Sequence, residues 1–136
     1  MQRIPSLFFA PSPLGGRGVF TGEDIVEGSV IEICPVIVLP PQQTSLLDQT
    51  VLYDYYFLWG ESDDAYAIAL GYGSLYNHSY SPNAEYQADF EGGHLHFYAV
   101  QPIKAGDEIT VNYNGSPEDE EEVWFVARRL EENDEK

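Results

Sequence analysis

The fold is decided by one stretch of sequence, Gly71-Tyr72-Gly73-Ser74-Leu75-Tyr76-Asn77-His78-Ser79-Tyr80-Ser81-Pro82-Asn83. It places three tyrosines among glycines and short polar side chains, which favour turns. Taken alone, its second half is equally well interpreted as a loop built on Asx turns with an incidental histidine. Its meaning therefore depends on the segments on either side.

Short β-type segments separated by Gly and Pro surround this stretch, and they predict a mainly β fold. The predicted strands cover residues 6–10, 18–21, 30–39, 66–70, 84–90, 94–100 and 108–111. Residues 25–31 and 103–109 share the pattern Ile-x-x-Gly-x-x-Ile. Each copy predicts a turn with glycine at positive φ that leads into a strand.

Two segments have helical periodicity. One apolar stripe predicts a short helix near residues 46–58, formed by Leu47, Val51, Tyr55 and Leu58. Ser116 and Pro117, followed by acidic residues, form a helix start signal. They predict an acidic helix over about residues 117–131.

Length and charge limit the classes of function. The 136 residues, 43% of them apolar, suit one domain with one core. The net charge of −17 argues against direct binding of nucleic acid or of an anionic membrane, and it favours a cationic partner. A single cysteine excludes a disulfide framework within the chain. No apolar run suggests a signal peptide or a membrane span, so we expect an intracellular protein, cytoplasmic or nuclear depending on its host.

Two further motifs complete the pattern. Gly15-Gly16-Arg17-Gly18 requires backbone that turns sharply or approaches something closely, and taken alone a tight hairpin turn is the favoured interpretation. Glu108-Ile109-Thr110-Val111-Asn112-Tyr113 predicts a strand that ends in a tyrosine. Such a tyrosine is more often a core residue than a catalyst.

In this order and spacing the motifs resemble those of the SET-domain protein methyltransferases, above all the compact stand-alone proteins of viral and bacterial type. Gly16-Arg17-Gly18 is similar to the family's Gly-x-Gly loop, and Asn77–Asn83 matches its Asn-His-Ser-x-x-Pro-Asn motif. Residues 108–113 match its tyrosine motif. The resemblance covers about residues 12–124 and implies a single SET domain over residues 1–136. It implies a β-clip-like fold of several small sheets and two short helices, with a pseudoknot that brings Asn77 and His78 beside Tyr113.

The resemblance also implies a function and a set of site residues. The function is transfer of methyl groups from S-adenosylmethionine (SAM) to a lysine ε-amine in a basic protein tail of the histone type. Tyr113 is implied as the catalytic residue. The implied cofactor residues are Gly16, Arg17, Gly18, Asn77, His78 and Trp124, and the implied substrate-lysine channel residues are Tyr55, Tyr72 and Tyr86.

The sequence departs from many chromatin members of the family. It has only Cys34, so the cysteine-rich zinc segment that follows the tyrosine in those enzymes is absent, and the acidic helix stands in its place. Trp124 is the residue expected to stack on the adenine, with core packing as the alternative. Cys34 is expected to be a small buried residue.

Two rival functions stay open at this point. A catalytically silent SET-like module would bind peptide or cofactor without turnover, although the intact Tyr113, Asn77 and His78 favour an enzyme. A β-barrel metalloprotein would use His94 and His96, but it needs a third ligand, and no metal site is predicted. The expected partner is a lysine-rich peptide, and a homodimer is possible.

Overall fold

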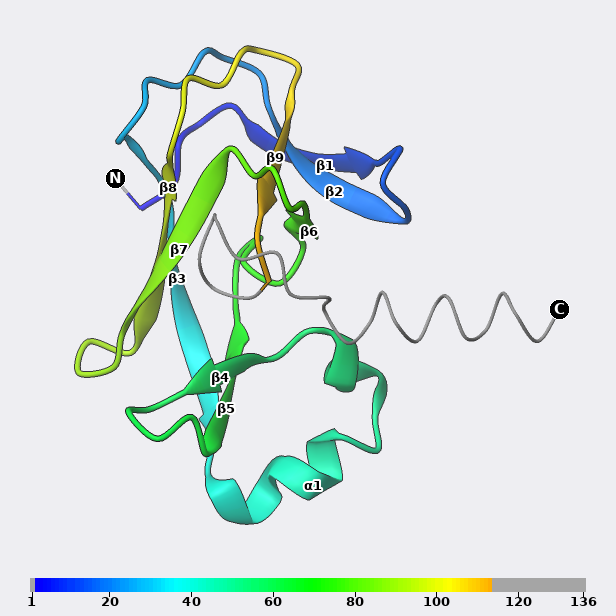
Figure 1. The fold of residues 1–136 in the computed structure, drawn as a ribbon, viewed down its shortest axis with the longest axis vertical. Coiled ribbons are helices and arrows are strands. Elements are labelled where there is room, and N and C mark those ends of the chain that lie inside the picture. Colours follow the sequence, from blue (N-terminus) through cyan, green and yellow to red (C-terminus); the bar gives the residue numbers. More distant parts are fainter. Residues whose placement is uncertain (1, 114–136) are drawn as a thin grey trace, which may run out of the picture.

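The structure is a computed structural model that describes residues 2–113 (Figure 1). Strands dominate this part of the chain, as predicted. They are β1 (Leu7–Pro11), β2 (Arg17–Thr21), β3 (Val30–Leu39), β4 (Phe57–Trp59), β5 (Ala65–Ala69), β6 (Asn77–His78), β7 (Ala84–Asp89), β8 (His94–Ala99) and β9 (Glu108–Val111). The helical elements are the 3-10 turns η1 (Pro41–Gln43) and η2 (Val51–Asp54) and the helix α1 (Thr44–Leu47).

The smaller sheet joins the two ends of the described chain. Its strand order is β1-β2-β9-β6, so β9 lies between an early strand and the Asn-His segment. β6 and β9 run parallel, with Asn77 opposite Thr110 and His78 opposite Val111. This pairing brings Asn77 and His78 beside the end of β9, where Tyr113 follows, as the pseudoknot predicted from the resemblance requires.

The larger sheet is organised by the long strand β3. Its order is β4-β5-β3-β8-β7. The first half of β3 pairs with β8 as far as Pro35, and the second half pairs with β5 from Val36 onward. Proline lacks an N–H group and cannot donate to a ladder, so a change of partner at Pro35 is favourable there.

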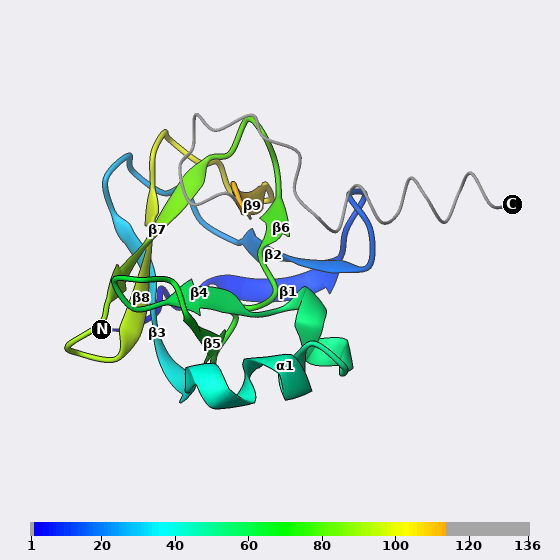
Figure 2. The same cartoon turned by 60° about the horizontal axis from the view of Figure 1, so that its bottom comes forward.

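One hydrophobic core joins the two sheets. Val19 and Ile109 from the smaller sheet and Leu95 and Phe97 from the larger sheet are at most 1% exposed and belong to one buried cluster. Figure 1 places α1 at the end of the molecule below β4 and β5, and Figure 2 shows residues 41–54 curving beside these two strands. No helix of the described residues is long and apolar enough to cross a membrane.

The repeated Ile-x-x-Gly-x-x-Ile segments form matching turns, as predicted. Gly28 has φ 87° and Gly106 has φ 92°. The first isoleucines of the two segments pair through backbone hydrogen bonds of 2.7 Å from Ile25 N and 3.0 Å from Ile103 N. The two turns therefore lie side by side and support each other.

The predicted helix near 46–58 is wrong in its extent. The α-helix ends at Leu47, and only the 3-10 turn η2 follows, because Thr50 separates the two: its hydroxyl donates to Leu47 O at 2.7 Å and accepts from Leu52 N at 3.2 Å, as the N-cap of η2. Phe57–Trp59 then forms β4 and pairs with Ala65–Ala67 of β5. Aromatic residues suit a strand, and the pairing prevails over the helical spacing. The predicted helix at 117–131 and Trp124 lie outside the described residues.

Gly106→Ala tests the matching turns. The added Cβ would meet no atom within 4 Å, so the cost is the positive φ alone. We expect a loss of about 1 kcal/mol in the free energy of unfolding, measured by urea denaturation. Gly106→Asn should lose less, because asparagine tolerates left-handed backbone better. Equal losses in the two variants would contradict this explanation.

Candidate functional site

The Glu108 carboxylate joins three of the sequence motifs. Ser12 Oγ donates to Glu108 Oε1 at 2.6 Å, and Asn77 Nδ2 donates to Glu108 Oε2 at 2.8 Å. Gly18 lies against the same carboxylate. A Cβ at Gly18 would overlap Glu108 Oε2 and come within 2.8 Å of Asn77 Nδ2. This position therefore needs glycine because the backbone and the carboxylate approach so closely.

Asparagine side chains complete the connection between the motifs. Asn77 Nδ2 also donates to Arg17 O at 3.1 Å, which ties the Gly-rich loop to β6. Asn83 Nδ2 donates to Glu108 O at 2.8 Å, and Asn83 Oδ1 accepts from Thr110 N at 2.9 Å. The side chain of Asn83 thus takes the place of a strand neighbour along β9. Gly16, Arg17, Gly18, Asn77 and His78, the predicted cofactor residues in the described part, lie together.

His78 holds the backbone of Tyr113. Tyr113 N donates to His78 Nδ1 at 3.0 Å, and the two rings have centroids 5.2 Å apart. Burial lowers the pKa of His78 from its ordinary value. Its Nδ1 therefore stays unprotonated at neutral pH and remains an acceptor. The predicted contact between the Asn-His motif and the tyrosine motif is a direct hydrogen bond.

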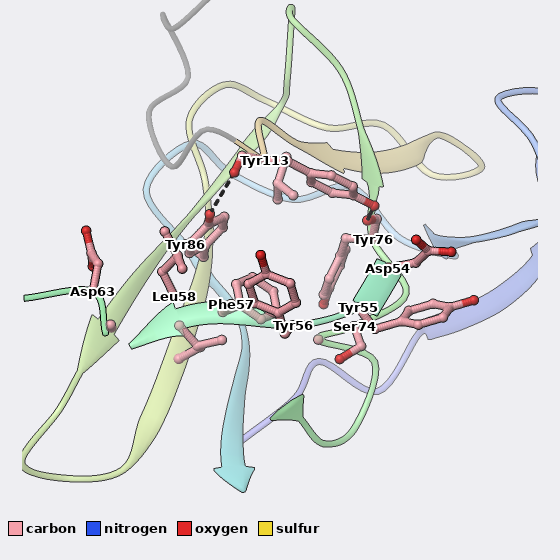
Figure 3. Close-up of a pocket in the computed structure, with 14 residues that line it drawn as sticks. Asp54, Tyr55, Tyr56, Phe57, Leu58, Asp63, Ser74, Tyr76, Tyr86 and Tyr113 are labelled. Carbon is pink, nitrogen blue, oxygen red and sulfur yellow. Dashed lines mark hydrogen bonds between the residues drawn. The ribbon is translucent and has the colours of Figure 1, made fainter. Parts of the chain in front are cut away.

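A cavity of about 440 Å³ opens beside Tyr113 (Figure 3). Its lining is rich in tyrosine: Tyr55, Tyr56, Tyr76, Tyr86 and Tyr113 all contribute. Its apolar walls are supplied by Phe57, Leu58, Leu95 and Val111.

Hydrogen bonds fix the position of the Tyr113 side chain. Its hydroxyl donates to Tyr76 O at 2.5 Å, and its own carbonyl accepts from the Tyr86 hydroxyl at 3.4 Å (Figure 3). Burial, with a smaller contribution from Glu85, raises the pKa of Tyr86 to about 12. Tyr86 therefore stays protonated and keeps its donor at neutral pH.

The structure separates the three predicted channel residues. Tyr55 and Tyr86 line the cavity together with Tyr113, whereas Tyr72 is not among its lining residues. The Tyr72 ring instead lies 4.7 Å from Arg3 Cζ and meets the edge of Phe9 at 5.9 Å between centroids. A turn connects Tyr72 to Tyr76, and Tyr76 lines the cavity while Tyr72 does not.

Sequence reasoning missed Tyr56 and Tyr76 as cavity residues. Tyr76 directly precedes Asn77, so its place in the motif was a usable signal. Tyr56 stacks on Tyr66 with centroids 3.8 Å apart, and burial raises its pKa above the ordinary value. Cys34 is fully buried, as predicted, and burial followed by the nearby Glu32 raises the pKa of its thiol.

The cavity has the composition of a site for an organic cation. Aromatic faces attract ammonium and methylated ammonium groups. Two carboxylates, those of Asp54 and Asp63, also line it, and Figure 3 shows them on opposite sides of the aromatic rings. Carboxylates at the sides of the cavity and aromatic rings in its centre can both attract a cation.

The two histidines proposed for a metalloprotein do come together. His94 Nε2 and His96 Nε2 are 2.7 Å apart, and Asp89 Oδ2 is 3.5 Å from His94 Nε2. Within residues 2–113, however, no group of three or more His, Cys, Asp or Glu side chains is arranged to hold a metal ion.

Comparison with known proteins places these features in a family. The model of the SET domain matches residues 16–114. A histone-lysine N-methyltransferase of Schizosaccharomyces pombe, specific for lysine 37 of histone H3, is 32% identical over 126 residues, which cover 88% of this chain and 80% of that protein.

Solved structures show the same fold. A Plasmodium falciparum protein described as a candidate histone methyltransferase has a TM-score of 0.64 and 30% identity, over 92% of this chain and 99% of that one. A chain of a humanised mutant of Polycomb Repressive Complex 2 from Chaetomium thermophilum has a TM-score of 0.71 and 20% identity, over 83% of this chain and 15% of that one. The second likeness concerns the fold alone.

Gly18→Ala tests the contact between the Gly-rich loop and Glu108. The added Cβ would overlap the carboxylate, so we expect the Ser12 and Asn77 hydrogen bonds to be displaced and the free energy of unfolding to fall by roughly 2–3 kcal/mol. Gly16→Ala is the matched control. Gly16 has φ 57° and open space around it, so only about 1 kcal/mol should be lost. Urea denaturation of both variants measures the difference, and equal losses would refute the proposed crowding.

Proposed function

The chain belongs to the SET-domain family of protein-lysine methyltransferases, and from this premise we propose that it transfers methyl groups from SAM to a lysine in a histone-like protein tail. The observation that carries the proposal is the position of Tyr113. Its hydroxyl is fixed by the Tyr76 carbonyl at the edge of a tyrosine-lined cavity, and its backbone is fixed by His78.

The cavity suits the chemistry of the lysine nucleophile. A lysine ammonium has no lone pair, so it must lose a proton, most simply to water, before it can attack a methyl group. Removal from bulk water into an aromatic cavity disfavours the charged form and lowers the lysine pKa. Tyr55 and Tyr86 line this cavity, and their rings would hold the amine and its methylated forms by cation–π attraction.

Tyr113 orients the reaction rather than exchanging a proton. Its single O–H donor is directed at Tyr76 O, so the lone pairs of its hydroxyl oxygen remain to accept. A fixed acceptor of this kind attracts the amine hydrogens and stabilises positive charge on a nearby carbon. Alignment of the reacting atoms is the main contribution that the protein makes to such a transfer.

The residues expected to hold SAM fit that role in the described structure. No atom lies within 4 Å of a Cβ built on Gly16, so the outer side of the Gly-rich loop is open to a ligand. Asn77 ties this loop to β6, next to His78. Gly16–Gly18 with Asn77 and His78 would hold the cofactor, partly through backbone groups, and SAM when bound supplies an activated methyl group on a sulfonium. Trp124, the expected adenine partner, lies outside the described residues.

The charge supports a basic protein as substrate. A net charge of −17 attracts lysine-rich tails and increases their association rate. The Schizosaccharomyces pombe relative is named for lysine 37 of histone H3, which makes histone H3 the first substrate to test. β4 is an edge strand next to the cavity, and a peptide could add to it as a further strand. We place the enzyme in the nucleus or cytoplasm, and homodimerisation stays a prediction.

Tyr113→Phe tests the proposed function. Removal of the hydroxyl should lower turnover by about 100-fold or more, because a fixed polar group in the transition state is lost. Binding of SAM, measured by calorimetry, should stay nearly unchanged. Transfer of a radiolabelled methyl group from SAM to core histones and lysine-rich peptides measures the turnover.

The matched control is Tyr98→Phe, which makes the same change on β8 at a residue outside the cavity lining. It should retain the turnover of the wild type. Loss of SAM binding in Tyr113→Phe would show that Tyr113 is structural. SAM binding by the wild type without labelling of any histone or peptide would favour a silent binding module.

Tyr86→Phe tests the channel. The Tyr86 hydroxyl occupies space beside Tyr113, so its removal makes room for a bulkier methylated amine. We expect the products to shift toward one more methyl group per lysine, as read by mass spectrometry of the modified peptide, with overall turnover changed by less than about tenfold. An unchanged product distribution would exclude Tyr86 from the channel.

A further inference from the structure

A buried carboxylate, that of Glu32, contacts the hydroxyl end of Tyr76, whose carbonyl contacts Tyr113. Glu32 is a charged residue, yet it is only 2% exposed. It belongs to strand β3 of the larger sheet. A carboxylate buried this deeply needs hydrogen-bonding partners, because desolvation of a charge is costly. The hydrogen-bonding partners of Glu32 therefore indicate its role.

A β-bulge turns Glu32 inward. The pairing of β3 with β8 shifts register between Val30 and Glu32, and the adjacent residues Ile31 and Glu32 are both buried. In a regular strand one of two neighbours would face the other side. Bulges commonly redirect a side chain in this way close to functional sites.

The two oxygens of Glu32 hold both ends of one short segment. Oε2 accepts from Tyr72 N at 3.0 Å, and Oε1 accepts from the Tyr76 hydroxyl at 2.7 Å. The Tyr76 ring is 1% exposed and stacks on Phe97 with centroids 4.5 Å apart. A Cβ on Gly71 would overlap Glu32 Oε2, so the chain just before this segment also follows the carboxylate closely.

The same segment supplies the acceptor for Tyr113. Tyr76 O, the last carbonyl before β6, accepts from the Tyr113 hydroxyl at 2.5 Å. A displacement of the Tyr76 side chain would move this carbonyl, because both belong to one residue. The Tyr76 pKa is raised well above its ordinary value by burial and next by Glu32, so its phenol remains a donor.

We propose that Glu32 is a positioning residue for methyl transfer, because it braces residues 72–76 and so fixes the Tyr76 carbonyl that orients the Tyr113 hydroxyl. This inference rests on the proposed function. Glu32 is not among the residues that line the cavity, and its hydrogen bonds described above go to Tyr72 and Tyr76. Its effect on the reaction is transmitted through the segment 72–76, which ends in the Tyr76 carbonyl.

A different role for Glu32 would be to pair with Arg3. Arg3 Nη1 is 3.8 Å from Glu32 Oε2, and the Arg3 side chain is 48% exposed. An exposed partner at this distance contributes little to stability. Arg3→Ala therefore separates the two roles, because it removes the cation and leaves the Tyr72 and Tyr76 hydrogen bonds in place.

Tyr76→Phe is the main test. The change keeps the ring and its packing on Phe97 but removes the contact with Glu32. We expect kcat for a histone peptide to fall by about 10- to 100-fold, as for a small misplacement of a reacting group, while KM for the peptide and the affinity for SAM stay nearly constant. Glu32→Leu should act in the same way. Glu32→Gln should recover most of the activity, because its amide can accept from Tyr72 N and donate to the Tyr76 hydroxyl.

Two controls and a second readout distinguish positioning from stability. Ile103→Val removes a buried methyl group at a core residue outside the cavity lining and should lower the melting temperature without changing kcat, and Arg3→Ala should leave kcat unchanged. In the enzyme without SAM, the NMR signals of a 13C-labelled Tyr113 ring should shift in Tyr76→Phe and stay in place in Ile103→Val.

The outcomes separate the inference from the function on which it rests. If Tyr76→Phe keeps its kcat and its Tyr113 signals while Tyr113→Phe loses turnover, the inference is wrong and the proposed function stands. A rise in KM alone, or a loss in Glu32→Gln as large as in Glu32→Leu, also overturns it. If the wild type transfers no methyl group to any histone or peptide, the proposed function fails, and this inference fails with it.

Discussion

The parallel pairing of β6 with β9 is the constraint on which the rest of the site depends. Two residues on each side form it, so its backbone hydrogen bonds alone would not hold strands from distant parts of the chain. Side chains supply the remainder: Glu108 gathers Ser12 and Asn77, and Asn83 binds along β9. The same residues set the positions of His78 and Tyr113. The stability of the fold and the geometry of the site therefore depend on the same contacts. A change at the Glu108 carboxylate is expected to affect both.

Recognition and reaction make opposite demands on the substrate lysine. The acidic surface and the two carboxylates of the cavity favour the ammonium form, whereas methyl transfer needs the neutral amine. The structure meets these demands in different places. Asp54 and Asp63 lie at the sides of the cavity, and the tyrosine and phenylalanine rings occupy its centre (Figure 3). Attraction of the cation and removal of its proton are thus separated along the path into the site.

The sequence was sufficient for the strands and turns that local chemistry determines. The alternating segments of β8 and β9 and the glycine turns at Gly28 and Gly106 were all predicted. The meeting of Asn77 with Tyr113 came from the family resemblance, because no local pattern encodes the parallel pairing of residues 77–78 with residues 110–111. Short or context-dependent elements were missed. β6 has two residues, and the helical spacing before β4 was overridden by pairing with β5. Tyr72 and Tyr76 differ only in which way a turn directs them, and the bulge that buries Glu32 leaves no mark in the sequence.

The strand order β1-β2-β9-β6 also has a consequence for how the chain is made. The strands β1 and β2 leave the ribosome first, yet the neighbour of β2 in the sheet is one of the last strands of the described chain. At a synthesis rate of roughly 5–20 residues per second, β2 waits several seconds for β9. During that interval the edge of β2 is unpaired and Val19, fully buried in the finished protein, is exposed to water. A nascent chain of this topology therefore exposes an edge that can pair with other chains until its final strand is inserted.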